Sequence, residues 1–270
     1  MSLRRSFVIA NVAVAVTTSK FAFSSKAEMQ ASSSPTKPKI TLYQYKICPY
    51  CNRVKALLAF LDIEYTSVEV SPLTKSQLKS TSHKKVPVAT IDEEILADSA
   101  LIVNYFTNPD SKIKSTRKLS KDFIPTDSEK WMEWSDRKLA VMLYPNITRS
   151  FKESWECFEY TNNVLEWSYP ERKITHLAGA FFMMLANGKI KKKYGIVKER
   201  EELMDVLKEW TNAIGKKQFL HGNYVTLPDL MVYGVLKSIA GLQTFNEVMN
   251  ESQELREWYL RVENEIAKKL

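Results

Sequence analysis

YKICPYC, residues 45–51, contains two cysteines separated by a proline and a tyrosine, at a point where the character of the chain changes. The preceding run ITLYQY, residues 40–45, is rich in β-branched and aromatic residues, as is typical of a β-strand. The following run NRVKALLAFLDI, residues 52–63, repeats its apolar residues at helical spacing. We therefore expect both cysteines to lie where a strand passes into a helix.

This position predicts that the two cysteines differ in reactivity. Cys48 stands just before the expected helix, Cys51 falls in its first turn, and Pro49 sits where a missing N–H costs nothing. Unpaired N–H groups at a helix N-terminus favour an anion, so we expect a lowered pKa for the Cys48 thiol. Cys48 would then be the reactive thiol, Cys51 a resolving or orienting thiol, and Tyr45 a hydrogen-bond donor to the Cys48 sulfur.

Other uses of a C-x-x-C pair fit less well. A structural zinc site needs about four ligands. The third cysteine, Cys157, and the three histidines show no ligand spacing, so we expect no metal site. Three cysteines are also too few for a disulfide scaffold. An inert pair of core cysteines stays open as an alternative, although C-P-x-C at a strand-to-helix junction is a specific signal.

Residues 39–108 contain the other elements of a small α/β domain, in the order β-α-β-α-β-β-α. After the cysteine helix we expect a strand at 65–71, a helix at 71–82, two hairpin strands at 86–92 and 93–97, and a helix at 98–106.

Two dipeptides of this domain suggest a binding site for an extended peptide. Pro87 cannot donate to a strand ladder, so it belongs at an edge or in a special turn, where a cis bond is an option. Such an edge leaves the backbone of Val86 free to pair with a peptide. Asp98 and Ser99 begin a helix, where N–H and hydroxyl groups suit a carboxylate, although ordinary helix capping explains them equally well.

A thiol, Val-Pro and Asp-Ser in this order resemble the glutathione site of the glutaredoxin and glutathione transferase branch of the thioredoxin fold. The resemblance implies an α/β thioredoxin-like (glutaredoxin-type) domain over residues 39–108. It also implies that the cysteine of glutathione faces Cys48, that Val86 pairs with the tripeptide backbone, and that Asp98 and Ser99 hold its γ-glutamyl end.

Residues 128–270 read as an all-α domain, joined to the first by a polar and basic linker at 109–127. The almost wholly apolar stretch at 174–186 predicts a buried helix, and the stretch at 199–215 predicts an amphipathic one.

A further apolar helix is expected at 226–242, where Thr226 and Asp229 have the spacing of a capping box. A last amphipathic helix is expected at about 252–268. The capped helix resembles the core helix of the glutathione transferase C-terminal domain, which implies that fold for the helical part.

Five segments together closely resemble the membrane-associated prostaglandin E synthase type 2 family. They are LYQYKICPYCNRVKALL, HKKVPVATIDE, DSALIVNYF, LPDLMVYGVLKSIAGL and EWYLRVENEI. The resemblance implies an isomerase that converts prostaglandin H endoperoxide to prostaglandin E with Cys48, supported by Tyr45 and secondarily by Cys51. It implies glutathione held by Val86 and its neighbour Pro87 and by the Asp-Ser pair. It also implies haem bound through the glutathione sulfur, without a protein ligand.

Two other functions stay open on the same residues. The C-P-Y-C motif also suits a glutathione-dependent thiol-disulfide oxidoreductase or transferase, with Cys48 as nucleophile and Cys51 as resolver. A non-enzymatic organellar protein that binds haem or glutathione is the third alternative. Under each, the partner is a small lipid peroxide or thiol. A homodimer is implied by the family, and peripheral membrane association is an option.

The N-terminal residues suggest where in the cell the protein acts. Residues 1–38 combine a basic start, a short apolar run and a serine-rich continuation, which predicts a targeting segment or a disordered tail. We favour a mitochondrial presequence, with a secretory-pathway or plastid signal as alternatives. The net charge of +8 is scattered and accompanies no base-reading motif, so we expect no nucleic-acid partner.

Overall fold

The computed structural model of the chain describes residues 38–268. The targeting segment expected at 1–38 therefore lies almost wholly outside the described residues, and it stays a prediction. Within residues 38–268, none of the helices combines the length and the apolar character needed to cross a bilayer.

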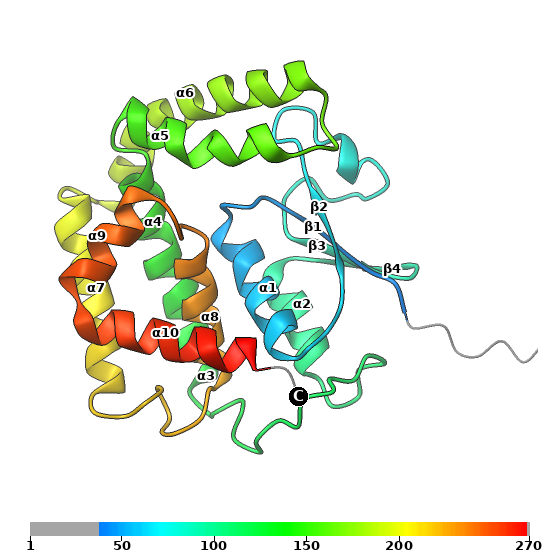
Figure 1. The fold of residues 1–270 in the computed structure, drawn as a ribbon, viewed down its shortest axis with the longest axis vertical. Helices are drawn as coiled ribbons and strands as arrows, with labels where there is room; N and C mark the ends of the chain where they lie inside the picture. The colour runs from blue at the N-terminus through cyan, green and yellow to red at the C-terminus, as the bar shows by residue number, and fades with distance from the viewer. Residues whose placement is uncertain (1–37, 269–270) are drawn as a thin grey trace, which may run out of the picture. The chain divides into compact units, whose positions relative to one another are not determined.

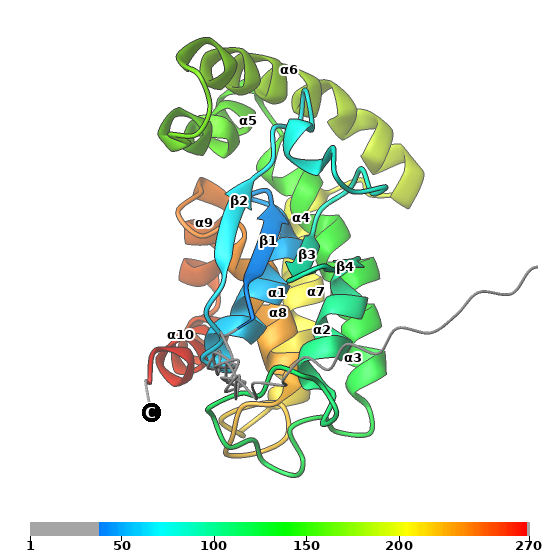
Figure 2. The same ribbon diagram turned by 90° about the vertical axis from the view of Figure 1, so that its right-hand side faces the viewer.

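The N-terminal part is built on a mixed four-stranded sheet (Figures 1 and 2). Its strands are β1 (Ile40–Gln44), β2 (Thr66–Glu69), β3 (Val88–Ile91) and β4 (Glu94–Ala97). Their spatial order is β2-β1-β3-β4, with β1 and β2 parallel and the other two pairs antiparallel. The helices α1 (Pro49–Phe60) and α2 (Ser99–Thr107) lie between this sheet and the C-terminal helices. This is the thioredoxin-like domain that the sequence predicts.

One helix expected in this domain does not form. Residues 71–82 contain only a single 3-10 turn, η1 (Ser76–Leu78), and otherwise follow an irregular path. Lys75, just before the turn, has the left-handed φ of 49°, and the Gln77 side chain accepts a hydrogen bond from the Ser71 N–H at 3.0 Å. Leu78 is the one large apolar side chain of the segment that is buried, so the segment lacks the apolar face that would hold a helix against the sheet.

The C-terminal part is helical, as predicted. Its helices are α3 (Ser128–Trp134), α4 (Ala140–Ile147), α5 (Phe151–Phe158), α6 (Tyr169–Tyr194), α7 (Glu199–Ile214), α8 (Leu227–Lys237), α9 (Gln243–Glu251) and α10 (Gln253–Ala267). A π-helical turn, η2 (Ser135–Leu139), joins α3 to α4, and a 3-10 turn, η3 (Glu159–Asn163), follows α5.

The helix α8 is the centre of this part, and every residue from Leu227 to Leu236 is buried. Its predicted capping box is confirmed, since the Asp229 carboxylate accepts from the Thr226 N–H at 3.1 Å. The same carboxylate accepts from the backbone N–H of Leu220 at 3.1 Å and from Trp258 Nε1 at 3.0 Å. This buried anion fixes the start of α8, and α1 packs directly along that helix.

The helix predicted at 174–186 forms within α6, but the prediction that it is buried is wrong. Five of its large apolar side chains are about half exposed: Ile174 (57%), Leu177 (56%), Phe181 (47%), Phe182 (62%) and Leu185 (54%). Within residues 38–268, it is the opposite side of α6, with His176 and Ala180, that packs against other elements. The helix is apolar on two faces, and the described chain covers one of them.

Candidate functional site

The junction between β1 and α1 is fixed by backbone hydrogen bonds and one amide side chain. The Cys48 N–H donates to the Tyr45 carbonyl at 3.0 Å, and the Cys48 carbonyl accepts the first bond of α1. Asn52 Nδ2 donates to the carbonyls of Lys46 at 2.7 Å and of Cys48 at 2.9 Å. Cys48 is thereby held as the residue before α1, with Pro49 in the first turn, as the sequence predicts.

The pKa of the Cys48 thiol is lowered, as expected. The largest cause is a hydrogen bond from the Cys51 side chain, and the N–H groups of Cys51 and Tyr50 and the charge of Arg53 act in the same direction, while burial opposes them. Burial raises the pKa of Cys51 well above its usual range, so Cys51 keeps its proton and can donate it. Cys48 is partly exposed and Cys51 is fully buried, which makes Cys48 the accessible thiol.

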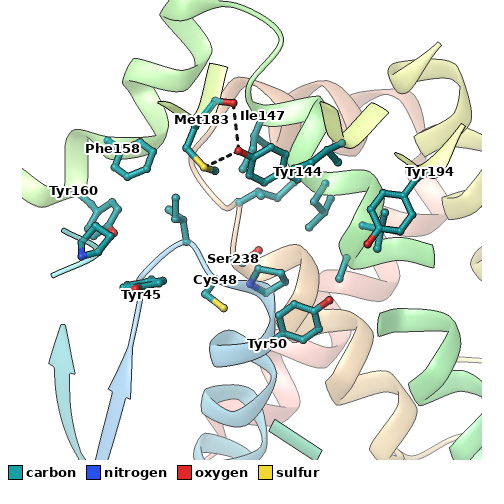
Figure 3. A pocket seen from close by; sticks show the side chains of 18 residues that line it. Tyr45, Cys48, Tyr50, Tyr144, Ile147, Phe158, Tyr160, Met183, Tyr194 and Ser238 are labelled. Atoms are coloured by element: carbon teal, nitrogen blue, oxygen red, sulfur yellow. Dashed lines mark hydrogen bonds between the residues drawn. The ribbon is translucent and has the colours of Figure 1, made fainter. Parts of the chain in front are cut away.

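We expected Tyr45 to donate a hydrogen bond to the Cys48 sulfur, but the side-chain donor to that sulfur is the Cys51 thiol. Tyr45 still lies next to Cys48, on the side toward Tyr160 (Figure 3). Burial and the neighbouring thiols raise the pKa of Tyr45 to about 12, so its phenol stays protonated and can donate to a ligand.

Cys48 opens into a cavity of about 360 Å³ between the sheet end and the helices α4 and α6. The size lies within the range of small-molecule sites. Most of the wall is apolar, with Ile47, Val141, Leu143, Ile147, Phe158, Ile190 and Ile239. Five phenols complete it: Tyr45, Tyr50, Tyr144, Tyr160 and Tyr194. Of these, only Tyr45 was predicted from the sequence, since nothing in the local pattern of the other four separates a wall residue from an ordinary core aromatic.

Hydrogen bonds hold the phenols of Tyr144 and Tyr160 in the wall. The Tyr144 hydroxyl donates to Met183 of α6, at 3.2 Å from its carbonyl oxygen and 2.8 Å from its sulfur (Figure 3). The Tyr160 hydroxyl donates to the Glu69 carboxylate, which also accepts from the Lys46 N–H at 2.8 Å. Burial raises the pKa of Glu69 to about 6, so a carboxyl group that titrates near neutral pH stands directly behind one wall of the cavity.

The predicted peptide-binding residues come together in an adjacent open groove of about 770 Å³. Its walls include Val86, Pro87, Asp98 and Ser99, and Tyr50 lines both the groove and the cavity. The groove also has a basic side, formed by His83, Lys84 and Lys85, which the sequence analysis did not assign.

The backbone of the groove is arranged for pairing. The peptide bond between Val86 and Pro87 is cis, and the N–H and C=O of Val86 have no backbone partner within residues 38–268. Asp98 has the unusual φ of 88° and caps α2 by accepting from the Ala100 N–H at 2.8 Å. The capping alternative therefore holds for the Asp98 side chain, while Ser99 accepts a hydrogen bond from Arg53 at 2.7 Å.

Comparison with known proteins agrees with this architecture. Residues 42–111 match the family described as glutathione S-transferase, N-terminal domain. Among solved structures, similarity extends to glutathione S-transferase III in apo form (TM-score 0.52, 16% identity, 85% of this chain and 96% of that one). It extends also to a variant of human glutathione S-transferase T1-1 (TM-score 0.50, 18% identity, 84% of each chain). At these identities the likeness concerns the fold.

Two curated relatives carry the same name. The chain is 30% identical to prostaglandin E synthase 2 of Danio rerio in an alignment of 277 positions that covers 87% of this chain and 73% of the relative. It is 28% identical to prostaglandin E synthase 2 of Mus musculus, over 89% of this chain and 74% of that one. Because the first of these matches reaches 30% identity over most of both chains, the chain belongs to the prostaglandin E synthase 2 family.

Proposed function

We propose that the chain is a glutathione-binding isomerase that converts prostaglandin H endoperoxide to prostaglandin E with the help of Cys48. One observation carries the proposal. A partly exposed thiol with a lowered pKa faces an apolar cavity, and the same wall residue, Tyr50, borders a groove suited to a peptide. The names of the curated relatives agree with it.

Glutathione fits the chemistry of the groove. The unpaired backbone of Val86 can form two hydrogen bonds with an extended peptide. The buried Ser99 hydroxyl and the start of α2 offer donors to the carboxylate of the γ-glutamyl end, and Lys84 and Lys85 offer cations to the other carboxylate. The thiol of the tripeptide would then point toward Cys48, past Tyr50.

The cavity suits a lipid peroxide. In the proposed reaction the Cys48 thiol polarises one oxygen of the endoperoxide while the O–O bond breaks. The adjacent C–H bond gives its proton to a base and its electron pair to a new carbonyl group. The other oxygen takes up a proton and becomes a hydroxyl group, so atoms and electrons balance with no net oxidation. The phenols around Cys48 stay protonated and can donate to the departing oxygen.

The test uses the purified protein with glutathione and prostaglandin H endoperoxide, with products measured by mass spectrometry. We expect prostaglandin E from the wild type, loss of that product in Cys48→Ser, and much of it retained in Cys51→Ser. A wild type that forms no prostaglandin E above the Cys48→Ser background would refute the isomerase. Equal loss in both variants would indicate a redox pair.

The glutathione-dependent thiol-disulfide oxidoreductase remains the second candidate, because the Cys51 sulfur lies within hydrogen-bond reach of the Cys48 sulfur and could form a disulfide with it. A disulfide-reduction assay with glutathione separates the two reactions, since only the oxidoreductase passes electrons from glutathione to a disulfide. Glutathione binding without turnover in either assay would support the non-enzymatic alternative.

The side chains that line the cavity show which sulfur atoms could bind haem iron. Of the lining residues, Cys48 and Met183 carry sulfur, and the Met183 sulfur is engaged by Tyr144. Iron would therefore depend on Cys48 or on the sulfur of bound glutathione, and the second option is what the family resemblance implies. Bound haem would supply iron chemistry that cleaves the endoperoxide, so malondialdehyde and the cleaved hydroxy acid among the products would indicate that haem is present.

We also propose that a second copy of the chain covers the outer face of α6. Residues 174–188 contain no charged side chain, and exposed apolar surface of this kind marks an interaction site. The exposed residues Ile174, Leu177, Phe181 and Leu185 follow the three- and four-residue spacing of a helix-helix seam. The inner face of the same helix carries Met183 of the cavity wall, so a dimer would brace that wall.

Light scattering of the wild type and of Phe181→Glu tests the dimer. We expect a dimeric wild type and a monomeric variant. A monomeric wild type that floats with lipid vesicles would instead favour peripheral membrane association.

A further inference from the structure

Arg53 is a fully buried cation two residues after Cys51 on α1. Its guanidinium donates to the Ser99 hydroxyl oxygen at 2.7 Å, to the Ser135 hydroxyl oxygen at 3.3 Å and to the Asp136 carboxylate. The arginine Nε has no hydrogen-bond partner within the described chain. A buried charge is costly to desolvate even when it is paired, so the arrangement calls for a reason beyond packing.

The contact with Ser99 sets the direction of that hydroxyl group. A guanidinium can donate hydrogen bonds and cannot accept them. The Ser99 oxygen must therefore be the acceptor, which leaves the hydroxyl hydrogen for another partner. Ser99 lines the groove, so the partner can be a ligand carboxylate. Arg53 thus makes Ser99 a donor toward the groove without touching the ligand.

Arg53 lies on α1, five residues after Cys48, the residue that caps the helix, and its positive charge favours the Cys48 thiolate. The Asp136 carboxylate, one-third exposed, pairs with the Arg53 guanidinium. Tyr50 lies between the two sites: its ring centre is 5.4 Å from the Arg53 guanidinium, and its hydroxyl donates to the Asp136 carbonyl at 3.4 Å. One side chain therefore contacts the groove, the shared wall and the helical part of the chain.

We propose that Arg53 is a positioning residue that links the two sites: it orients Ser99 toward a carboxylate in the groove and, together with Asp136, sets the charge at Cys48. The first half rests on the proposed function, since it takes the groove to bind glutathione. The second half does not depend on any ligand.

The test of the second half compares two substitutions in one ion pair. Arg53→Met removes the positive charge, and Asp136→Asn removes the negative charge that offsets it. We measure the rate of Cys48 carbamidomethylation by iodoacetamide against pH, with mass spectrometry to locate the label. Arg53→Met should raise the pKa of Cys48, because the thiolate loses a neighbouring positive charge. Asp136→Asn should lower that pKa, because the thiolate loses a neighbouring negative charge. A purely structural role predicts shifts in the same direction, or none.

The other ionisable groups around Cys48 are unchanged in both variants. They are Cys51, Tyr50 and Lys55 on α1, Tyr45 after β1, and Tyr160 on η3. Shifts of opposite sign in the pKa of Cys48 would therefore show that the charges of Arg53 and Asp136 act on this thiol. Shifts of the same sign, or profiles that match the wild type, would overturn the assignment.

Arg53→Lys tests the first half and guards against misfolding. It keeps the charge but cannot hold Ser99 and Asp136 at once as a planar fork does. We expect a Cys48 profile close to the wild type and glutathione binding weakened about tenfold, measured by calorimetry. Unchanged glutathione affinity in Arg53→Lys would refute the role at Ser99. A wild type that binds no glutathione would refute the proposed function, while the alkylation profiles would still decide the charge at Cys48.

Discussion

Replacing Gly234 with alanine should destabilise the chain, because at this position α8 packs directly against the backbone of α1. A Cβ atom there would stand 2.5 Å from Arg53 Cα, 2.7 Å from Arg53 N and 2.8 Å from the Asn52 carbonyl oxygen. Ordinary contacts of this kind are 3.4–4 Å. All three atoms are backbone, so no side chain can rotate away, and α1 itself must shift by about 1 Å.

The size of the effect follows from two opposing contributions. Alanine in a helix interior gains about 1 kcal/mol over glycine. Overpacking costs typically about 1–3 kcal/mol and more where backbone must move, as here. We expect a net loss of about 2 kcal/mol in the free energy of unfolding. For a chain of this size that corresponds to a fall in Tm of about 4–8 °C.

Gly188 provides a matched control, since it is also helical and a Cβ atom there would meet nothing within 4 Å. Gly188→Ala should leave Tm unchanged or raise it slightly. Thermal unfolding followed by circular dichroism measures both variants. A Gly234→Ala protein as stable as Gly188→Ala would show that the close packing of α1 on α8 is wrong. The site built on α1 would then lose its support.

Three further predictions concern buried ionisable groups. Asp229→Ala leaves three buried N–H donors without an acceptor, so urea unfolding should show a loss of about 3–5 kcal/mol; a loss under 1 kcal/mol would contradict the network. Burial raises the pKa of Glu69 from 4.5 to about 6, so the folded protein is more stable when Glu69 is protonated. This contribution to the free energy of unfolding is lost as the pH rises through 6. Glu69→Gln should therefore gain about 2 kcal/mol relative to wild type between pH 4 and pH 8, and a pH-independent difference would contradict the burial. Iodoacetamide at pH 7 should label Cys48 and spare Cys157, whose pKa burial raises to about 12; equal labelling would contradict the lowered pKa of Cys48.

The reactive half of the site could be predicted because its information is local. The strand, the C-P-Y-C turn and the helix occupy consecutive residues, and a helix N-terminus acts on a thiol through its own backbone. The places of Val86 and Asp98 were predictable for the same reason, since a proline is typical of the start of a strand and a capping residue of the start of a helix.

The cavity walls could not be predicted, because they depend on which distant segments pack together. Tyr144 and Tyr160 lie about a hundred residues after Cys48, and nothing in their own neighbourhood marks them as wall residues. Arg53 is a stronger example. An arginine one turn into a helix usually faces solvent, and only the packing of α8 and η2 against α1 buries it. The burial of α6 was predicted wrongly for a related reason. An apolar sequence indicates that a helix has a face to be covered, but it does not tell whether the covering segment belongs to the same chain.

The two cysteines of the motif hold unequal positions, and this bears on the choice between isomerase and oxidoreductase. A resolving cysteine must lose its proton to attack a mixed disulfide. Cys51 is fully buried and burial raises its pKa, so at neutral pH it is a poor nucleophile and a constant donor to the Cys48 sulfur. An isomerase needs only that donor, because its thiol returns unchanged after each turnover. The structure thus gives Cys51 the property that the isomerase requires, while the oxidoreductase would first have to bring the Cys51 sulfur out of its buried, protonated state.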